Sequence, residues 1–284
     1  MVMGKKVLLG LLLLTIIATS CQKVEALMEA TFKSQDLLNI SYGTDPNKIM
    51  DVYLPAGRGD NTEIVFLIHG GSWSSGDKSE FTEHAINLRR MGYAVVNLNY
   101  RLVTSSGTVK LADQINDIRE AVNFAYSKSV DWEVSNKIGL VGASAGAHLA
   151  LLYTYAYNAD DKVKTVVSLA GPVNFNDARN VSAQLASVVE GLVGAKLSTN
   201  PQAFTALSPI AKVTANSKPT LIFHGRKDTT VPIQQSIDLK AKLDEANVKN
   251  KLVIYENAGH EVVNTENMAS FMADLSSWLN ANIK

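Results

Sequence analysis

The chain has 284 residues, of which 46% are hydrophobic, and its 27 Lys and Arg residues balance its 27 Asp and Glu residues. This composition supplies a substantial core and excludes disorder for most of the chain, and the lack of net positive charge argues against nucleic acid as a partner. Cys21 is the single cysteine, which excludes an internal disulfide and a zinc site built from several cysteines.

Residues 1–21 have the features of a lipoprotein signal peptide. Two lysines precede an uncharged stretch, residues 7–18, which as a helix would rise about 18 Å and is too short for a hydrocarbon core of about 30 Å. Residues 18–21 (ATSC) then resemble a relaxed bacterial lipobox, in which the cysteine is lipidated and becomes the mature N-terminus. We therefore expect an exported bacterial lipoprotein, anchored through Cys21 at the periplasmic or cell-surface face. The alternative is an ordinary secretory signal beside a chance cysteine.

Residues 22–36 lack strand alternation and are expected to form a tether, followed by one folded domain over residues 37–284. After two short early strands, continuous apolar runs typical of strands buried on both faces of a parallel sheet follow at 64–68, 94–98, 138–141, 163–169, 219–223 and 252–255. Between and after them, apolar residues at helical spacing occur at 111–125, 147–157 and 268–279. This alternation predicts an α/β fold with a mostly parallel sheet of eight strands and helices on both faces.

Residues 176–207 lie between two predicted strands and are longer than a simple crossover. We expect a small, mainly helical insertion over the sheet edge. It is either a substrate lid or an elaborated crossover with no gating role.

A candidate nucleophile lies between the predicted strand 138–141 and the helix that follows it. Residues 142–146 (GASAG) match the pattern G-x-S-x-G, with Ser144 at the centre. Small residues on either side let a sharp strand-to-helix turn pack closely and present the serine oxygen at the carboxyl end of the sheet. The helix N-terminus behind it would stabilise developing negative charge.

A serine hydroxyl needs a base, and the base needs an acid that fixes its tautomer. His260 is the candidate base, because it lies in a loop after the last predicted strand; Asp228 is the candidate acid, with Asp177 as the alternative. Ser144, Asp228 and His260 each follow a different strand, in the order expected for an α/β-hydrolase. The other four histidines are assigned to loop shaping (His69 and His224), local packing (His148) and a solvated helix surface (His84).

The candidate oxyanion hole follows the predicted strand 64–68. Residues 69–73 (HGGSW) contain two adjacent glycines, which let a backbone approach a substrate closely. We assign the donors to the backbone N–H groups of Gly70 or Gly71 together with that of Ala145. Trp73 either forms a wall of the substrate pocket or only packs the loop.

These pieces together resemble the α/β-hydrolase serine esterases from about residue 41 to the C-terminus. Within that superfamily the chain is similar to the carbohydrate-acyl esterases known as bifunctional feruloyl/acetyl xylan esterases, to hormone-sensitive-lipase-like esterases and to kynurenine formamidases. The resemblance implies an α/β-hydrolase fold, a Ser-His-Asp triad, an ester substrate with a short or carbohydrate-linked acyl group, and no cofactor. The segments that carry it are residues 41–43, 51–55, 69–73, 99–102, 142–147, 208–209, 228 and 259–260. The proline-containing continuation common in hormone-sensitive-lipase-like members is missing after Leu102, which disfavours that subgroup.

Other classes of function fit less well. Residues 260–264 (HEVVN) begin like the zinc motif H-E-x-x-H, but Asn264 replaces the second histidine, and we expect no metal. A serine peptidase or amidase of the same fold is the nearest alternative. A non-enzyme alternative is a lipid-anchored glycan-binding protein that kept the fold and lost turnover.

Overall fold

The computed structural model describes residues 33–104, 107–177 and 182–283. The predicted signal peptide and Cys21 lie outside the described residues, as does most of the predicted tether. No helix in the described ranges combines the length and the apolar character that a membrane crossing requires.

Eight strands form one sheet in the order β1-β2-β4-β3-β5-β6-β7-β8. The two early strands pair antiparallel to each other, β2 pairs antiparallel to β4, and all other pairs are parallel. The strands are β1 (Gln35–Ser41), β2 (Ile49–Leu54), β3 (Ile64–Ile68), β4 (Ala94–Leu98), β5 (Ile138–Ala143), β6 (Val163–Leu169), β7 (Thr220–Gly225) and β8 (Asn250–Tyr255). The predicted eight-stranded, mostly parallel sheet is confirmed.

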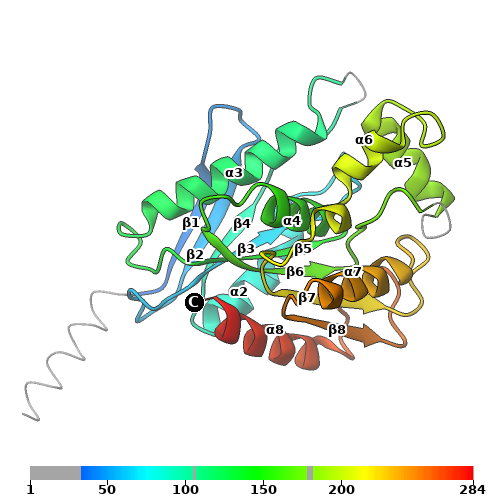
Figure 1. Ribbon diagram of the computed structural model, residues 1–284. Helices are drawn as coiled ribbons and strands as arrows, with labels where there is room; N and C mark the ends of the chain where they lie inside the picture. Colours follow the sequence, from blue (N-terminus) through cyan, green and yellow to red (C-terminus); the bar gives the residue numbers. More distant parts are fainter. Residues whose placement is uncertain (1–32, 105–106, 178–181, 284) are drawn as a thin grey trace, which may run out of the picture.

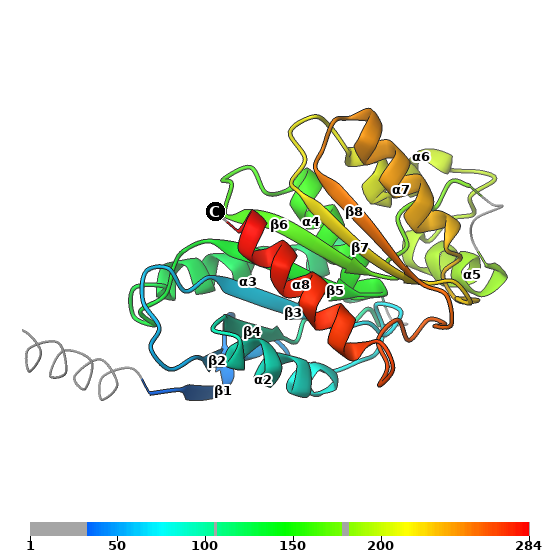
Figure 2. The same ribbon diagram turned by 90° about the horizontal axis from the view of Figure 1, so that it is seen from below.

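Helices cover both faces of this sheet (Figures 1 and 2). The helices are α2 (Thr82–Arg90), α3 (Leu111–Lys128), α4 (Ala145–Ala156), α5 (Ala183–Val193), α6 (Pro201–Leu207), α7 (Gln234–Glu245) and α8 (Met268–Asn282), with the 3₁₀ turns η1 (Lys78–Phe81) and η3 (Pro209–Lys212). Apolar residues of α3, α4 and α7 pack on one face, and those of α2 and α8 pack on the other.

The strand β3 shows why the central strands are continuous apolar runs. Ile64, Phe66 and Ile68 point to the core under α3 and α4, whereas Val65 and Leu67 point to the core over α2 and α8. Successive side chains of a strand alternate between the two faces, and both faces are buried here, so every position is apolar.

The structure corrects the end of the predicted tether. β1 begins at Gln35, so Gln35 and Asp36, which pair with Leu54 and Tyr53, belong to the sheet and not to the tether. β1 is an edge strand with mostly exposed side chains. It therefore lacks the apolar alternation by which a half-buried strand is found in a sequence.

The predicted insertion contains the helices α5 and α6, which lie between β6 and β7 in the chain and stand at one end of the sheet (Figure 1). Ser182, the N-cap of α5, donates a hydrogen bond from its hydroxyl to the carbonyl of Thr230, 2.8 Å away. The insertion is thus joined to the loop after β7, at the carboxyl end of the parallel strands.

Candidate active site

Ser144 joins β5 to α4 in a sharp turn. Its backbone has φ 51° and ψ −120°, which is a strained conformation for a residue other than glycine. The flanking glycines leave room for the turn: a Cβ atom on Gly142 would lie 2.4 Å from the carbonyl oxygen of Gly146, and one on Gly146 would lie 2.2 Å from that of Ile68. The motif G-x-S-x-G therefore reflects close backbone packing around a half-buried serine.

Ser144, His260 and Asp228 meet at the carboxyl ends of β5, β8 and β7. His260 Nε2 lies 2.9 Å from Ser144 Oγ, and His260 Nδ1 lies 2.8 Å from Asp228 Oδ2. Because a carboxylate only accepts hydrogen bonds, Nδ1 carries the proton and Nε2 is left to accept the serine proton. Both ring nitrogens are engaged by Ser144 and Asp228, so Asp177 is not the partner of this imidazole.

The Asp228 carboxylate is fully buried and fully hydrogen-bonded. Its Oδ1 accepts from the backbone N–H groups of Thr230 (2.8 Å) and Val231 (2.9 Å). Burial alone would raise the pKa of the Asp228 carboxyl, but hydrogen bonds from His224, His260 and the N–H of Val231 outweigh it and hold this pKa well below its usual range. Asp228 is therefore ionised at any pH at which an esterase would be assayed.

Two of the three candidate N–H donors, those of Gly70 and Ala145, belong to backbone next to Ser144. A Cβ atom built on Gly70 would lie 3.3 Å from Ser144 Cβ, so the backbone of Gly70 passes directly beside the serine. Ala145 is the first residue of α4, and the N–H groups in the first turn of a helix have no helical carbonyl to bond. Within the described ranges, the N–H groups of Gly70, Gly71 and Ala145 donate no hydrogen bond to another residue. They remain available to a negatively charged oxygen next to Ser144.

Trp73 is buried and packs within the loop. Its side chain is 1% exposed, and its Nε1–H donates a hydrogen bond to Nδ1 of His148, 3.1 Å away. An indole N–H can only donate, so His148 must carry its own proton on Nε2, which bonds the carbonyl of Leu207 at 2.8 Å. Burial lowers the pKa of His148 to about 4, against the opposing effect of the Leu207 bond, so the imidazole is neutral.

The loop that carries Gly70 and Trp73 is fixed by neighbouring elements. The Tyr100 hydroxyl donates to the carbonyl of His69 (2.9 Å) and its ring stacks on the His69 ring at 4.4 Å. Gln114 of α3 donates to the carbonyl of Trp73 (2.7 Å). These contacts hold the loop in place although Ser72 and Trp73 both have positive φ.

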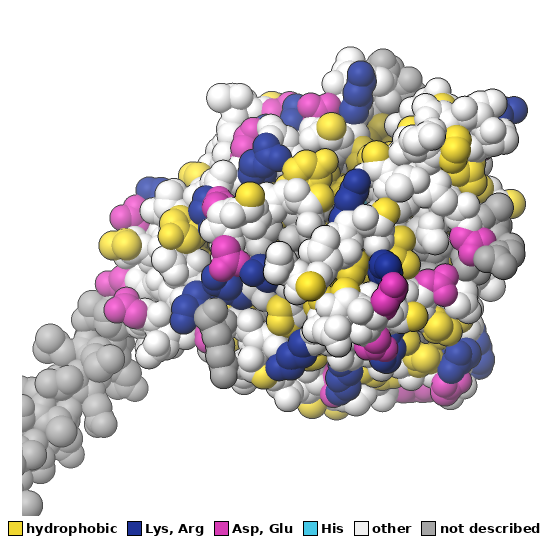
Figure 3. Space-filling model, in the orientation of Figure 1, with side chains coloured by type: hydrophobic (Ala, Val, Ile, Leu, Met, Phe, Trp, Pro, Cys, Tyr) yellow, Lys and Arg dark blue, Asp and Glu magenta, His cyan; other side chains and the backbone are white. Residues whose placement is uncertain are grey.

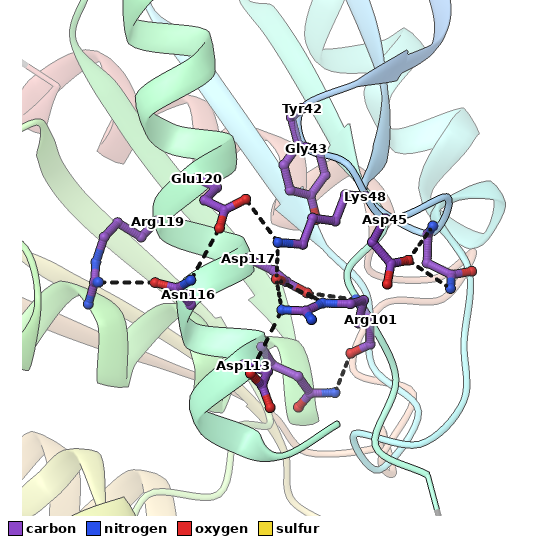
Figure 4. Close-up of polar contacts among 12 residues, drawn as sticks. Tyr42, Gly43, Asp45, Lys48, Arg101, Asp113, Asn116, Asp117, Arg119 and Glu120 are labelled. Atoms are coloured by element: carbon purple, nitrogen blue, oxygen red, sulfur yellow. Dashed lines mark hydrogen bonds and ion pairs between the residues drawn. The ribbon is translucent and has the colours of Figure 1, made fainter. Parts of the chain in front are cut away.

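A cluster of charged residues joins α3 to Arg101 in the segment after β4 (Figure 4). Asp117 of α3 is fully buried and accepts hydrogen bonds from the Arg101 side chain, the closest at 2.6 Å, and from the Arg101 backbone N–H at 3.0 Å. Lys48 lies 3.1 Å from Asp117 and 2.9 Å from Glu120. Gln114, one turn before Asp117, donates to the carbonyl of Arg101 as well as to that of Trp73, which connects the cluster to the loop beside Ser144.

A cavity of about 450 Å³ lies between the two helices of the insertion. Most of its lining is apolar, with Glu190 and Ser198 as the polar members; the apolar residues are Phe175, Ala186, Val189, Leu197 and Phe204. The ring of Phe175 also contacts those of His148 (5.2 Å) and Trp73 (6.1 Å). The side chain of Phe175 therefore connects the cavity to Trp73, in the loop that also carries Gly70.

Two of the remaining histidines, His84 and His224, have roles that differ from those expected. His84 is half-buried between the rings of Phe81 and Phe271, and so is not the solvated residue that its charged neighbours suggested. His224 is fully buried and lies 3.2 Å from Asp228, a contact that sequence reasoning missed. The available signal was the spacing of four residues between His224 and Asp228 just after a strand.

No group of three or more potential metal ligands occurs in the part of the chain that the structure describes.

The surface around these elements carries no strong charge of one sign. Figure 3 shows that Lys and Arg side chains are interspersed with Asp and Glu over the face seen in Figure 1. This distribution agrees with the net charge of zero.

Comparison of the sequence with known proteins identifies a family. The BD-FAE family model matches residues 50–243, which is more than half of the chain. The curated relatives include an isoprenylcysteine alpha-carbonyl methylesterase of Arabidopsis thaliana, 24% identical over 81% of this chain and 57% of its own length, and esterase LipC of Mycobacterium tuberculosis, 25% identical over 69% and 52%. The chain thus spans little more than half the length of these relatives.

Solved structures agree on the fold. A truncated carbohydrate esterase from gut microbiota superposes with a TM-score of 0.74 at 22% identity and covers 87% of this chain and 98% of its own. Esterase B from Lactobacillus rhamnosis gives a TM-score of 0.72 at 19% identity, covering 94% and 93%. These likenesses confirm the α/β-hydrolase fold predicted from the sequence. The chain is a member of the BD-FAE family of α/β-hydrolases.

Proposed function

We propose that this protein is a serine hydrolase that cleaves carboxylic esters through an acyl-enzyme. The observation that supports it most strongly is the chain of contacts from Ser144 Oγ to His260 to Asp228, 2.9 Å and 2.8 Å long, beside N–H groups with no other partner. These are the parts that acyl transfer requires: a nucleophile, an oriented base and donors for an oxyanion.

The reaction proceeds in two halves. His260 Nε2 takes the proton of Ser144 as Oγ attacks the ester carbonyl carbon, and the oxygen that becomes negative accepts hydrogen bonds from Ala145 and from Gly70 or Gly71. The imidazolium then donates its proton to the departing alcohol oxygen, which leaves Ser144 acylated. Water gives a proton to His260, attacks the acyl carbon, and releases the carboxylic acid as Ser144 regains its proton.

For the substrate we propose short acyl esters, including acyl groups carried by carbohydrates. Two observations support this class: the solved relative described as a carbohydrate esterase, and the mainly apolar cavity of about 450 Å³ beside Phe175. We further propose that this cavity accepts part of the substrate, which would make α5 and α6 a lid. The alternative of an elaborated crossover with no such role predicts that filling the cavity leaves substrate choice unchanged.

The test of the chemistry is a panel of acetyl, butyryl, octanoyl, feruloyl and acetylated-sugar esters, with an aminoacyl anilide and a formanilide as amide substrates. Wild type should hydrolyse esters, and Ser144→Ala should lower turnover by about a millionfold. Faster cleavage of an amide would favour the peptidase or amidase alternative, for which a dipeptidyl aminopeptidase of Pseudoxanthomonas mexicana is a relative at 26% identity. Turnover that Ser144→Ala leaves unchanged would refute the proposal.

The cavity has its own test. Ala186→Phe on α5 should fill part of it and shift the preference of kcat/KM toward shorter acyl chains by about tenfold, the value of about one methylene group. Ser187→Phe, on the exposed side of the same helix, is the matched control and should change nothing. Equal chain-length profiles for the two variants would refute a substrate role for the cavity.

We also propose that the protein is exported and anchored to a membrane through lipid on Cys21. The basis is the sequence of residues 1–21 alone. Several acyl chains would bind stably, since each buried CH₂ contributes about 0.8 kcal/mol. Mass spectrometry of the membrane fraction should find a mature chain that begins at acylated Cys21, and a Cys21→Ala variant should be released. An unmodified Cys21 would refute this.

A further inference from the structure

The triad carboxylate is in contact with a second imidazole. His224, in β7, is fully buried, and its Nε2 lies 3.2 Å from Asp228 Oδ2 and 2.9 Å from the carbonyl oxygen of Val231. Its Nδ1 lies 2.6 Å from Oγ of Ser236, which is itself buried on α7. The contacts therefore run from Ser236 through His224 and Asp228 to His260.

The partners determine where the protons are. Nε2 of His224 faces a carboxylate and a carbonyl, and both can only accept, so Nε2 must carry a hydrogen. In the neutral ring Nδ1 then has a lone pair, which accepts the hydroxyl hydrogen of Ser236. The single Nε2–H of His224 is shared between the Val231 carbonyl at 2.9 Å and Asp228 Oδ2 at 3.2 Å, so Oδ2 is in contact with the N–H groups of two imidazoles, His224 and His260.

We propose that His224 is a positioning residue for the reaction: its Nε2–H, held in place by Ser236, fixes the Asp228 carboxylate in the orientation that receives Nδ1–H of His260. This inference rests on the proposed function. The backbone N–H groups of Thr230 and Val231 hold only Oδ1 of Asp228, and His224 is the buried donor on Oδ2 besides the base itself. Without His224, the Oδ2 side of the carboxylate would be held by His260, which is the base that the carboxylate has to orient.

The opposing interpretation is that His224 merely fills a buried space between β7 and α7. The two interpretations differ in what a replacement side chain must supply. A structural role needs volume, whereas a positioning role needs an N–H group at the place of Nε2. His224→Gln keeps a terminal N–H there, and His224→Met keeps similar volume without any donor.

The experiment compares these two variants in the complete protein, after loss of activity in Ser144→Ala has established the chemistry. His224→Met should lower kcat by about 10- to 100-fold, the effect of one lost hydrogen bond to a charged group, with KM within about twofold. His224→Gln should restore most of kcat. His84→Met, a half-buried histidine that packs against Phe271 instead of the triad, is the matched control and should leave kcat unchanged.

Non-additivity provides the second part of the test. If His224 acts through Asp228, then His224→Met added to Asp228→Asn should cost no further activity, because the carboxylate it positions is already gone. Additive losses would overturn the proposal, as would equal kcat values for His224→Met and His224→Gln. If His224→Met fails to fold, Ser236→Ala takes its place, with a smaller loss of kcat that must also vanish in Asp228→Asn.

A readout without turnover separates this inference from the proposed function. The proton shared by His260 Nδ1 and Asp228 should give a downfield NMR resonance in ¹⁵N-labelled protein. It should shift in His224→Met and remain near its wild-type position in His224→Gln. An unshifted resonance in folded His224→Met would refute the positioning role even if the protein hydrolysed no ester in the panel.

Discussion

Trp73→Phe tests how far the loop beside Ser144 depends on one buried hydrogen bond. The substitution keeps an aromatic ring but removes Nε1–H, which leaves Nδ1 of fully buried His148 without its donor. An acceptor left unsatisfied costs about 1–3 kcal/mol, and the smaller ring adds a cavity cost of about 1 kcal/mol. The expected destabilisation of about 2–4 kcal/mol should lower the Tm of a domain of this size by roughly 4–15 °C.

Activity should change as well, because the same loop carries Gly70. One oxyanion donor increases kcat by about 10²- to 10³-fold. A donor displaced by a fraction of an ångström loses part of this rate enhancement, so we expect kcat to fall about tenfold. Trp278→Phe is the matched control: Trp278 Nε1 donates to Thr165 Oγ1 at 2.8 Å, is also buried, and belongs to the core on the other face of the sheet.

Urea unfolding and ester hydrolysis measured on both variants separate the two effects. Both variants should lose stability, and only Trp73→Phe should lose kcat. An unchanged free energy of unfolding in Trp73→Phe would refute the predicted cost of leaving His148 without its donor. An equal loss of kcat in Trp278→Phe would refute the link between this hydrogen bond and the loop.

Two further predictions concern His148 and Gly146. Between pH 6.5 and about 4 the unfolded chain binds a proton at His148 and the folded chain does not, so stability should fall as the pH drops through this window, by at most roughly 3 kcal/mol. Urea unfolding at pH 7 and pH 4.5 should show a smaller fall for His148→Gln than for wild type, and equal falls would contradict the assignment. Gly146→Ala would place Cβ 2.2 Å from the backbone oxygen of Ile68, so it should cost about 2 kcal/mol or more and disrupt turnover. Gly191→Ala on α5, where a Cβ atom meets nothing within 4 Å, should instead be neutral or stabilising by less than about 1 kcal/mol, and a reversed order would refute the steric argument.

The central part of the fold was predictable because its strands are buried on both faces. Every position of β3 is apolar for that reason, and β4 to β7 are largely buried too, whereas the edge strand β8 is only half-buried. The edge strand β1 was expected as an early strand, but its first two residues were assigned to the tether, since its exposed side chains carry no such pattern. Its start at Gln35 depends on pairing with Leu54, which only the folded chain reveals.

The candidate site was predictable where chain order determines position. Ser144, Asp228 and His260 each follow a parallel strand, and the carboxyl ends of parallel strands meet at one edge of a sheet. The local packing of His148 was expected, but the hydrogen-bond partners of His148 and His224 could not be predicted in the same way. Each depends on a partner that folding brings into contact, Leu207 for the first and Ser236 for the second.

Trp73 illustrates the same limit within a single motif. Its position two residues after Gly71 is compatible with a pocket wall and with a packing role, and both need a large aromatic ring. The hydrogen bond that holds the indole, to His148, 75 residues further along the chain, could not be predicted from the motif.

The most direct test of the account is covalent labelling of the nucleophile. A fluorophosphonate that reacts with activated serines should add one equivalent to the wild-type protein, and peptide mass spectrometry should locate it on Ser144. His260→Ala should react at least about a thousandfold more slowly, and Ser144→Ala should not react. A label on any other residue, or equal rates in wild type and His260→Ala, would contradict the assignment of Ser144 as a nucleophile activated by His260.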